Sequence, residues 1–517
     1  MAIQSFYHIL SVIGLCLVAV LALDRLYQRF SHRWTNEPPM LPYRIPIVGH
    51  ALMFGSDVFG LFRHAECVLL VPCGLDNVLT RTDRETFPNC QPYSLMMFGK
   101  RLYVCFTSAL FDFISCSKQV FPDPKDVSTI FRNPKSLPFL PLIESLSGLA
   151  WDISPEGMKI LTKVDPDTGD SLFRNAHVFY REALKPGPQL DTLTLNFLKH
   201  LNEALDAFDR ENENSAIESP SLMRWSKQIL GTASTNAMMG PTLLRANPDL
   251  LPNVWLVEEG FFLFINKVPR IFARKQYEGR DRAIGAFDNY FAQKEEEREG
   301  CVRMIGERER ELREAGLNNR DVAAYSYSAY AALLNNANPM AYHLLRHIFS
   351  PTSLSQLRAE VAPAFALSDR ITTLDQLNYL IMSCPLLRAF YYETLRVHSA
   401  NSSNRKVVEE TLVGGYTLRV GRNVLLPSYV QHNKEEYFGS DTSQFNPERF
   451  LESASKKANP KMVRAFGGGV SLCSGRHFAS SEILSYTASI LWKYNVVFQA
   501  RGAFRIERRD RMTENNL

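Results

Sequence analysis

The chain has 517 residues, 45% of them hydrophobic, which is enough to bury one large core or two to three smaller ones. Its 58 Lys and Arg against 54 Asp and Glu leave an excess of +4 with no basic tail, so we expect no nucleic-acid partner. Nine cysteines without a Cys-x-x-Cys pair argue against a zinc module or a disulfide framework and favour a reducing compartment.

The first 33 residues have the features of a membrane anchor. Phe6 to Leu23 is uncharged, mostly apolar and about long enough to cross a bilayer, and Arg25, Arg29 and Arg33 follow it. No Lys or Arg precedes the segment and no small-residue cleavage site ends it, so we predict a retained single-pass helix over residues 1–33 with its basic flank. Because positive charge favours the cytosolic side, the rest of the chain should face the cytosol.

A proline-rich hinge is predicted over residues 34–50, where prolines forbid helix continuation and stiffen the chain. We assign residues 51–517 to a single domain. Short strands are expected at Arg101–Phe106 and Phe111–Ile114, followed by mainly helical patterns from about residue 123 to residue 349.

Two charged or aromatic stretches interrupt the helical region. Pro252–Lys275 mixes five large aromatic side chains with four basic ones, which suits either a membrane interface or a buried helix pair with a charged rim. Lys294–Glu314 alternates charges densely and is predicted to be a solvated surface helix.

An apolar helical run from Ser326 to Phe349 contains Ala337, Asn338 and Pro339. Pro339 lacks the N–H of an interior helix bond, so we expect a local kink there. His343 and His347 have the spacing of a helical zinc-protease site but lack the carboxylate that would act as base, and we interpret both as packing or surface residues.

Three motifs near the end of the chain carry the chemistry. Glu393 and Arg396 stand at i and i+3 on one helix face, and Arg449 lies in the segment Pro-Glu-Arg-Phe about fifty residues later. A glycine-rich loop, Phe-x-x-Gly-x-x-x-Cys-x-Gly, then runs from Phe466 through Gly469 and Cys473 to Gly475. Glycines let a backbone fold closely around a thiolate that ligates iron, although a lone cysteine in a glycine turn is more often simply buried.

These motifs, in this order, resemble the cytochrome P-450 family of microsomal type. The resemblance implies a mainly α fold with a small β subdomain, preceded by one transmembrane helix in the endoplasmic reticulum membrane. It implies a haem cofactor with Cys473 as its axial thiolate, with Phe466, Gly469 and Gly475 also binding the haem. Glu393, Arg396 and Arg449 would form a charge network that braces the underside of the haem pocket.

The resemblance also assigns residues where this chain departs from the family pattern. Ser471 stands where the family usually has a cation for a haem propionate, so Arg405 is the expected propionate ligand, with His177 or Arg181 as a further contact. Ala337 and Asn338 replace the acid and threonine that usually relay protons during oxygen activation. This resembles the subgroup of sterol 7-hydroxylases and prostacyclin synthase.

The implied function is a membrane-anchored haem-thiolate monooxygenase that oxidises a lipophilic terpenoid, steroid or other secondary metabolite. No dinucleotide fingerprint is present, so electrons would come from a separate NADPH-dependent flavoprotein reductase. Basic residues around the ligand loop could form a docking surface for an acidic reductase: Lys456, Lys457, Lys461, Arg464 and Arg476. The alternatives are a reductase-independent peroxide isomerase or dehydratase of the same fold, and a non-catalytic haem-binding protein.

Overall fold

The computed structural model describes residues 93–97, 100–104, 130–131, 133–167, 169–212, 217–219, 221–349, 353–399, 401–413, 415–454, 457–499 and 504–509. The predicted anchor, the hinge and the strand expected at Phe111–Ile114 lie outside these residues. Within the described ranges, no helix is both long and apolar enough to cross a membrane.

The chain divides into two compact units that interleave along the sequence. Residues 1–142, 399–443 and 461–472 form the first unit, and residues 143–398, 444–460 and 473–517 form the second. The candidate ligand loop therefore crosses from the first unit to the second between Leu472 and Cys473.

The first unit is built on a four-stranded sheet in the order β1-β2-β7-β4, comprising β1 (Tyr93–Met97), β2 (Lys100–Val104), β7 (Asn423–Pro427) and β4 (Ser402–Lys406). β2 and β7 are parallel, and the other pairs are antiparallel. A hairpin, β5 (Thr411–Val413) and β6 (Tyr416–Leu418), and two short helices, α19 (Ser428–His432) and α20 (Glu435–Phe438), also belong to it. Buried apolar side chains of the strands, such as Tyr103 and Val424, form its core.

The second unit is mainly helical. Its helices are α6 (Leu140–Trp151, which begins in the first unit), α7 (Pro155–Thr162), α8 (Leu172–Ala183), α9 (Pro188–Glu211), α10 (Leu222–Met239), α11 (Thr242–Ala246), α12 (Leu250–Ile265), α13 (Arg274–Ala292), α14 (Arg303–Glu314), α15 (Asn319–Ile348), α16 (Leu354–Val361), α17 (Leu374–Ser383), α18 (Pro385–His398) and α21 (Arg476–Lys493). A small antiparallel sheet has the order β3-β9-β8, from β3 (Ile217–Ser219), β9 (Phe504–Arg508) and β8 (Tyr494–Phe498). The predicted class, mainly α with small sheets, is confirmed.

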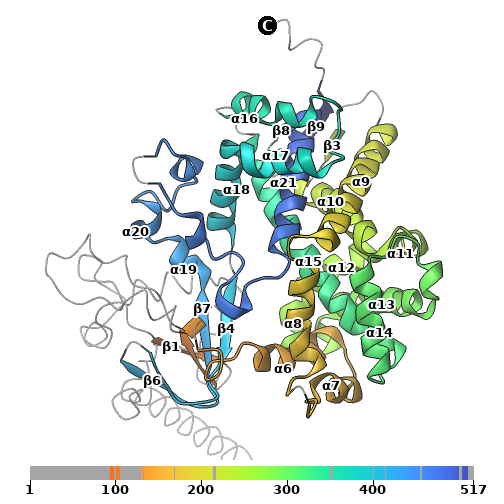
Figure 1. Ribbon diagram of the computed structural model, residues 1–517, viewed down its shortest axis with the longest axis vertical. Coiled ribbons are helices and arrows are strands. Elements are labelled where there is room, and N and C mark those ends of the chain that lie inside the picture. Colours follow the sequence, from red (N-terminus) through yellow and green to blue (C-terminus); the bar gives the residue numbers. More distant parts are fainter. Residues whose placement is uncertain are drawn as a thin grey trace, which may run out of the picture. The chain divides into compact units, whose positions relative to one another are not determined.

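The long helix α15 organises the second unit, because α10, α13, α18 and α21 all pack against it (Figure 1). It begins where the Asn318 side chain accepts a hydrogen bond from the backbone N–H of Asp321. It continues through Pro339 to Ile348, so the proline does not end the helix. The helix predicted from Ser326 is present and starts earlier in the chain than expected.

The charged stretch Lys294–Glu314 is not the simple solvated helix that its composition predicts. Arg298 and Glu309 are buried and form an ion pair of 2.5 Å, with the Arg298 guanidinium over the rings of Tyr290 and Phe291. The ion pair and the aromatic rings offset the cost of burying these two charges. An alternating charge pattern in the sequence does not show whether the charged side chains are buried or exposed. The prediction was wrong for this part of α14 and the turn before it.

Candidate functional site

The glycine-rich loop adopts a backbone that few other residues could follow. Gly467 and Gly469 have φ angles of 74° and 61°, in the left-handed region that favours glycine. A Cβ atom on Gly469 would lie 2.9 Å from the carbonyl oxygen of Phe131, which no real side chain tolerates. The predicted loop residue Phe466 is half-buried. The sequence pattern of this loop therefore reflects both its conformation and its close packing.

Cys473 follows this loop as a free, exposed thiol, and Gly475 caps the start of α21. A Cβ atom on Gly475 would lie 2.9 Å from Cδ2 of Leu333 on α15, so a larger residue here would require the Leu333 side chain to move. Although the residue as a whole is exposed, desolvation of its sulfur raises the pKa of the Cys473 thiol. Hydrogen bonds from the backbone N–H groups of Gly475 and Arg476 oppose that rise. These are the donors that a ligating thiolate requires.

Glu393, Arg396 and Arg449 come together as one buried charge network. The Glu393 carboxylate accepts two hydrogen bonds from Arg396, both of 2.7 Å, and one of 3.2 Å from Nε of Arg449. The backbone N–H of Asn446 donates to the same carboxylate at 2.8 Å. Both arginines also reach the carbonyl of Gln444. Because Glu393 has no solvent exposure, the network is not a solvated helix face.

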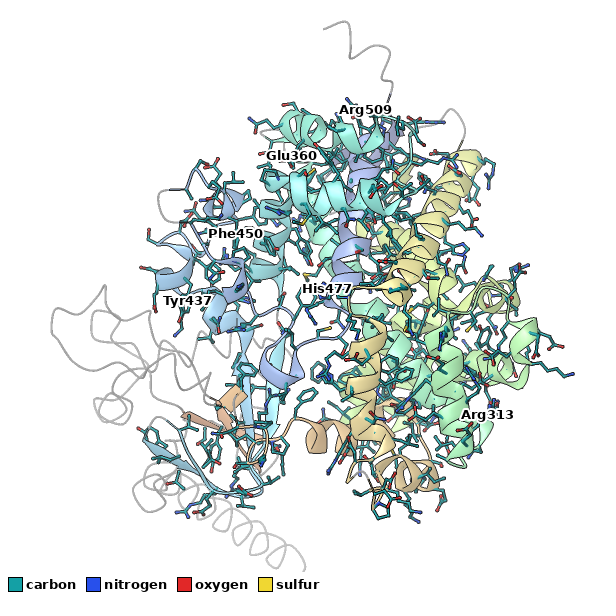
Figure 2. All side chains as sticks on the ribbon, viewed as in Figure 1. Arg313, Glu360, Tyr437, Phe450, His477 and Arg509 are labelled. Carbon is teal, nitrogen blue, oxygen red and sulfur yellow. The ribbon has the colours of Figure 1, made fainter. Side chains whose placement is uncertain are left out.

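A carboxylate that sequence reasoning missed holds the start of the helix carrying this network. Glu360 accepts hydrogen bonds of 2.8 Å from the backbone N–H groups of Leu386 and Leu387, in the first turn of α18 (Glu360 is labelled in Figure 2). Free N–H groups at a helix start need such partners. No local capping pattern signals this contact, because Glu360 belongs to a different helix.

Arg405 is a buried cation in strand β4. Its guanidinium donates to Oγ of Ser471 at 2.7 Å and lies over the rings of Phe131 and Phe139. Burial lowers the pKa of Arg405 to about 10. Among the described residues no carboxylate forms an ion pair with it, and a buried charge normally has one. A buried cation from β4 therefore lies beside Ser471.

Three further residues that the sequence did not single out hold the segment just before the ligand loop. Nε2 of Gln431 donates to the carbonyl of Met462 at 2.8 Å, and Nε2 of His432 accepts from the backbone N–H of Arg464 at 2.8 Å. Nδ2 of Asn401 donates to the Arg464 carbonyl at 3.1 Å. Their spacing carries no motif, since the contacts depend on the fold.

The central helix places its two unusual residues in the interior. Ala337 is 4% exposed and Asn338 is 1% exposed. Nδ2 of Asn338 is buried and has no hydrogen-bond partner within the described part of the chain. Such an orphaned amide is rare in native interiors and indicates a group that water or a ligand would satisfy.

The remaining candidates are the further propionate contacts and the basic residues around the loop. His177 is half-buried on α8, where Arg181 is exposed and 3.7 Å from Glu182. Around the loop, Lys457 and Lys461 are exposed. Arg464 and Arg476 are half-buried, so they are poorer docking residues than predicted, and Lys456 lies outside the described residues.

His343 and His347 pack as predicted. His343 stacks on His398 with ring centres 3.7 Å apart, and His347 stacks on Phe445 at 3.5 Å. Within the described residues no cluster of His, Cys, Asp or Glu could hold a metal ion.

The fold and the cysteine loop together define the class of haem-thiolate proteins. The family model described as Cytochrome P450 matches residues 252–510, half of the chain. The chain therefore belongs to the cytochrome P450 family and is an oxidoreductase enzyme.

Relatives and a solved structure agree with this assignment. Cytochrome P450 monooxygenase poxD of Penicillium oxalicum is 26% identical over 94% of this chain and 93% of its own length. A cytochrome P450 monooxygenase of Gibberella zeae is 24% identical over 89% of this chain and 81% of its own length. The structure of retinoic acid bound cyanobacterial CYP120A1 shares the fold, with a TM-score of 0.64 and 15% identity over 92% of this chain and 99% of that chain.

The residues present fit the haem-thiolate cofactor that the family implies. Cys473 offers a free sulfur with backbone donors aimed at it. Arg405 offers a buried cation without a carboxylate among the described residues, which a haem propionate would neutralise.

Proposed function

We propose that this protein is a membrane-anchored monooxygenase of the endoplasmic reticulum that inserts an oxygen atom into a lipophilic small molecule. The substrate class is a terpenoid, steroid or other secondary metabolite, and a separate NADPH-dependent flavoprotein reductase supplies the electrons. The observation that carries the proposal is Cys473, a free thiol between a glycine-rich loop and the first turn of α21.

In this proposal Cys473 would ligate the haem iron, Arg405 would bind a propionate, and Phe466, Gly469 and Gly475 would shape the backbone around the thiolate. When bound, the haem supplies oxygen activation, and its thiolate ligand favours O–O cleavage. Glu393, Arg396 and Arg449 keep α18 and the segment after Gln444 in a fixed arrangement.

Asn338 has the role of ordering water in the active site. Its amide can donate and accept hydrogen bonds but is a poor proton donor, and Ala337 has no polar group. The unpartnered, buried Nδ2 atom supports this role, because a water molecule there would satisfy it. Protons would then arrive along a water chain or from a substrate hydroxyl.

Membrane association is supported by an exposed apolar tip, defined as the last turn of α12 and the turn that follows it. Phe262, Ile271 and Phe272 are 54%, 82% and 79% exposed, and exposed basic residues surround them in the sequence: Lys267, Arg270, Arg274 and Lys275. Large apolar side chains with a basic rim suit a membrane interface. Several other side chains of α12 are buried, as the alternative of a buried helix pair with a charged rim expects.

One observation favours a second candidate, a peroxide isomerase or dehydratase that needs no reductase. Ala337 and Asn338 stand where oxygen-activating relatives are expected to carry a proton relay, as in the subgroup of sterol 7-hydroxylases and prostacyclin synthase. A rearrangement of a substrate that already contains the O–O bond requires no such relay.

Reconstitution under labelled dioxygen separates the two candidates. The full chain is incubated with reductase, NADPH and a panel of lipophilic substrates under oxygen-18 gas. A monooxygenase incorporates one labelled oxygen atom only when reductase and NADPH are present. Conversion of hydroperoxide substrates without reductase, and without incorporation of label, would instead support the isomerase.

A further inference from the structure

We propose that Tyr391 is a positioning residue for the Cys473 sulfur and acts on it through Ser480 and the first turn of α21. The proposal rests on the assignment of Cys473 as the haem ligand. It concerns a residue two positions before Glu393 that the charge network does not use.

A chain of two hydrogen bonds links α18 to α21. The Tyr391 hydroxyl lies 2.9 Å from Oγ of Ser480, and Oγ of Ser480 donates to the carbonyl oxygen of Arg476 at 2.9 Å. A serine hydroxyl has one hydrogen, so Ser480 must accept from Tyr391. Burial also raises the pKa of Tyr391, which keeps its hydroxyl protonated as the donor.

The chain ends on the turn that faces the sulfur. The backbone N–H groups of Gly475 and Arg476 bond to the Cys473 sulfur, and the Arg476 guanidinium donates to the Cys473 carbonyl at 2.9 Å. The Arg476 carbonyl that Ser480 holds is in the same residue as one of these N–H groups. Holding this turn therefore holds the direction of the N–H groups that bond to the sulfur. Hydrogen bonds to a ligating sulfur tune the reduction potential of the metal that the sulfur binds.

Packing alone does not explain why residue 391 is a tyrosine and so carries a hydroxyl. Tyr391 is 4% exposed, and a phenylalanine ring would fill the same space. Its neighbour Tyr392 is half-buried, contacts the rings of Tyr391 and Phe450, and lies on the same helix. A buried hydroxyl is costly unless it is hydrogen-bonded, so its presence beside the cysteine turn indicates a specific use.

The test is the midpoint potential of the haem in Tyr391→Phe, Ser480→Ala, the double variant and the control Tyr392→Phe. Each change removes a hydroxyl and little or no packing volume. Both single variants should shift the potential to more negative values, because weaker N–H bonds leave the sulfur more electron-rich. The double variant should shift no further than either single variant, since both act through one chain. Tyr392→Phe should match the wild type.

An unchanged potential in Tyr391→Phe, with normal haem content and a normal thiolate spectrum, would overturn the proposal. So would additive shifts, or a loss of haem in Tyr391→Phe while Ser480→Ala keeps the wild-type potential. Failure of the underlying ligand assignment looks different, because Cys473→Ser would then retain the thiolate spectrum.

Discussion

At the scale of single residues, the Glu393 carboxylate is the centre of the buried charge network, because it forms ion pairs with two buried arginines. We therefore expect changes to these ion pairs to reduce the stability of the protein. Arg396→Ala would break the buried Arg396–Glu393 pair and leave the carboxylate with only Arg449 and the Asn446 N–H among the partners named above, at a cost of about 3–5 kcal/mol in the free energy of unfolding. We expect little haem-loaded protein and a lower melting temperature, measured by haem absorbance and thermal unfolding.

The pair Glu156 and Lys159 provides a matched control for that experiment. It has the same i,i+3 spacing, with an N–O distance of 3.4 Å, but its side chains are 74% and 76% exposed. Lys159→Ala should change the unfolding free energy by less than about 1 kcal/mol. Equal effects in Arg396→Ala and Lys159→Ala would show that the Glu393 network contributes no more than a surface ion pair.

Asn338→Ala tests the water-ordering role. The variant should bind haem normally but form less product per reducing equivalent and release more peroxide, because the active-site water is no longer held. NADPH consumption, product and peroxide are measured together in the reconstituted system. If coupling equals that of the wild type, Asn338 only fills space beside Pro339.

Motifs in the sequence pointed to some of the candidate site residues. The sequence carried no signal for residues that act only by a hydrogen bond to a distant part of the chain. Cys473, Glu393, Arg396, Arg449 and Arg405 were all proposed because the motifs and positions that contain them resemble those of the cytochrome P450 family, and such a resemblance is visible in a linear pattern. Glu360, Gln431 and His432 were not, since each holds a distant backbone group whose position depends on tertiary structure.

At the scale of secondary-structure elements, the packing of α21 on α10 contains an isolated acid. Glu482 is 2% exposed, and Oγ of Ser234 donates to it at 2.5 Å. Burial raises the pKa of Glu482 from 4.5 to about 8, so the folded protein holds a proton here that the unfolded chain releases above about pH 4.5. The stability associated with protonated Glu482 is therefore fully present below pH 4.5. It is lost, as a decrease in the free energy of unfolding, as the pH rises to about 8.

Glu482→Gln removes this titration and keeps an acceptor for Ser234. The variant should melt at a higher temperature than the wild type at pH 8, and the difference should shrink towards zero as the pH falls to about 4.5. Thermal unfolding across this pH range is the measurement. A wild-type advantage at pH 8, or a difference that does not depend on pH, would show that Glu482 is ionised in the folded protein.

Element prediction succeeded where apolar periodicity was long and failed where charges were buried. The run from Ser326 predicted α15 because its apolar residues repeat at helical spacing. In α14, Arg308 and Glu309 are buried instead, and Arg308 donates to the Tyr325 hydroxyl and the Leu172 carbonyl. An alternating charge pattern looks the same whether its partners are water or protein groups.

At the scale of the whole molecule, the proposed membrane interface places Ile271 in lipid. Tryptophan introduced at this position, 82% exposed, should be quenched by brominated lipids in vesicles containing the full chain. Leu367 is 97% exposed and lies outside the proposed interface, so Leu367→Trp is the control and should not be quenched. Equal quenching at the two positions, or none at Ile271→Trp, would contradict insertion of this tip.

The family and the mainly α class followed from the sequence because three motifs in order are specific to one fold. The division into two units that interleave along the chain did not, since nothing in the pattern marks the crossing between Leu472 and Cys473. The anchor over residues 1–33 lies outside the described residues and stays a prediction.

The most direct test of the account is the absorption spectrum of the reduced, carbon-monoxide-bound protein, compared between the wild type and Cys473→Ser. A free thiol in the ligand loop predicts the red-shifted Soret band of thiolate ligation in the wild type. Cys473→Ser should lose that band while an equivalent change at the buried Cys384 keeps it. Retention of the full thiolate band in Cys473→Ser would contradict the assignment of the haem ligand, on which the proposed function depends.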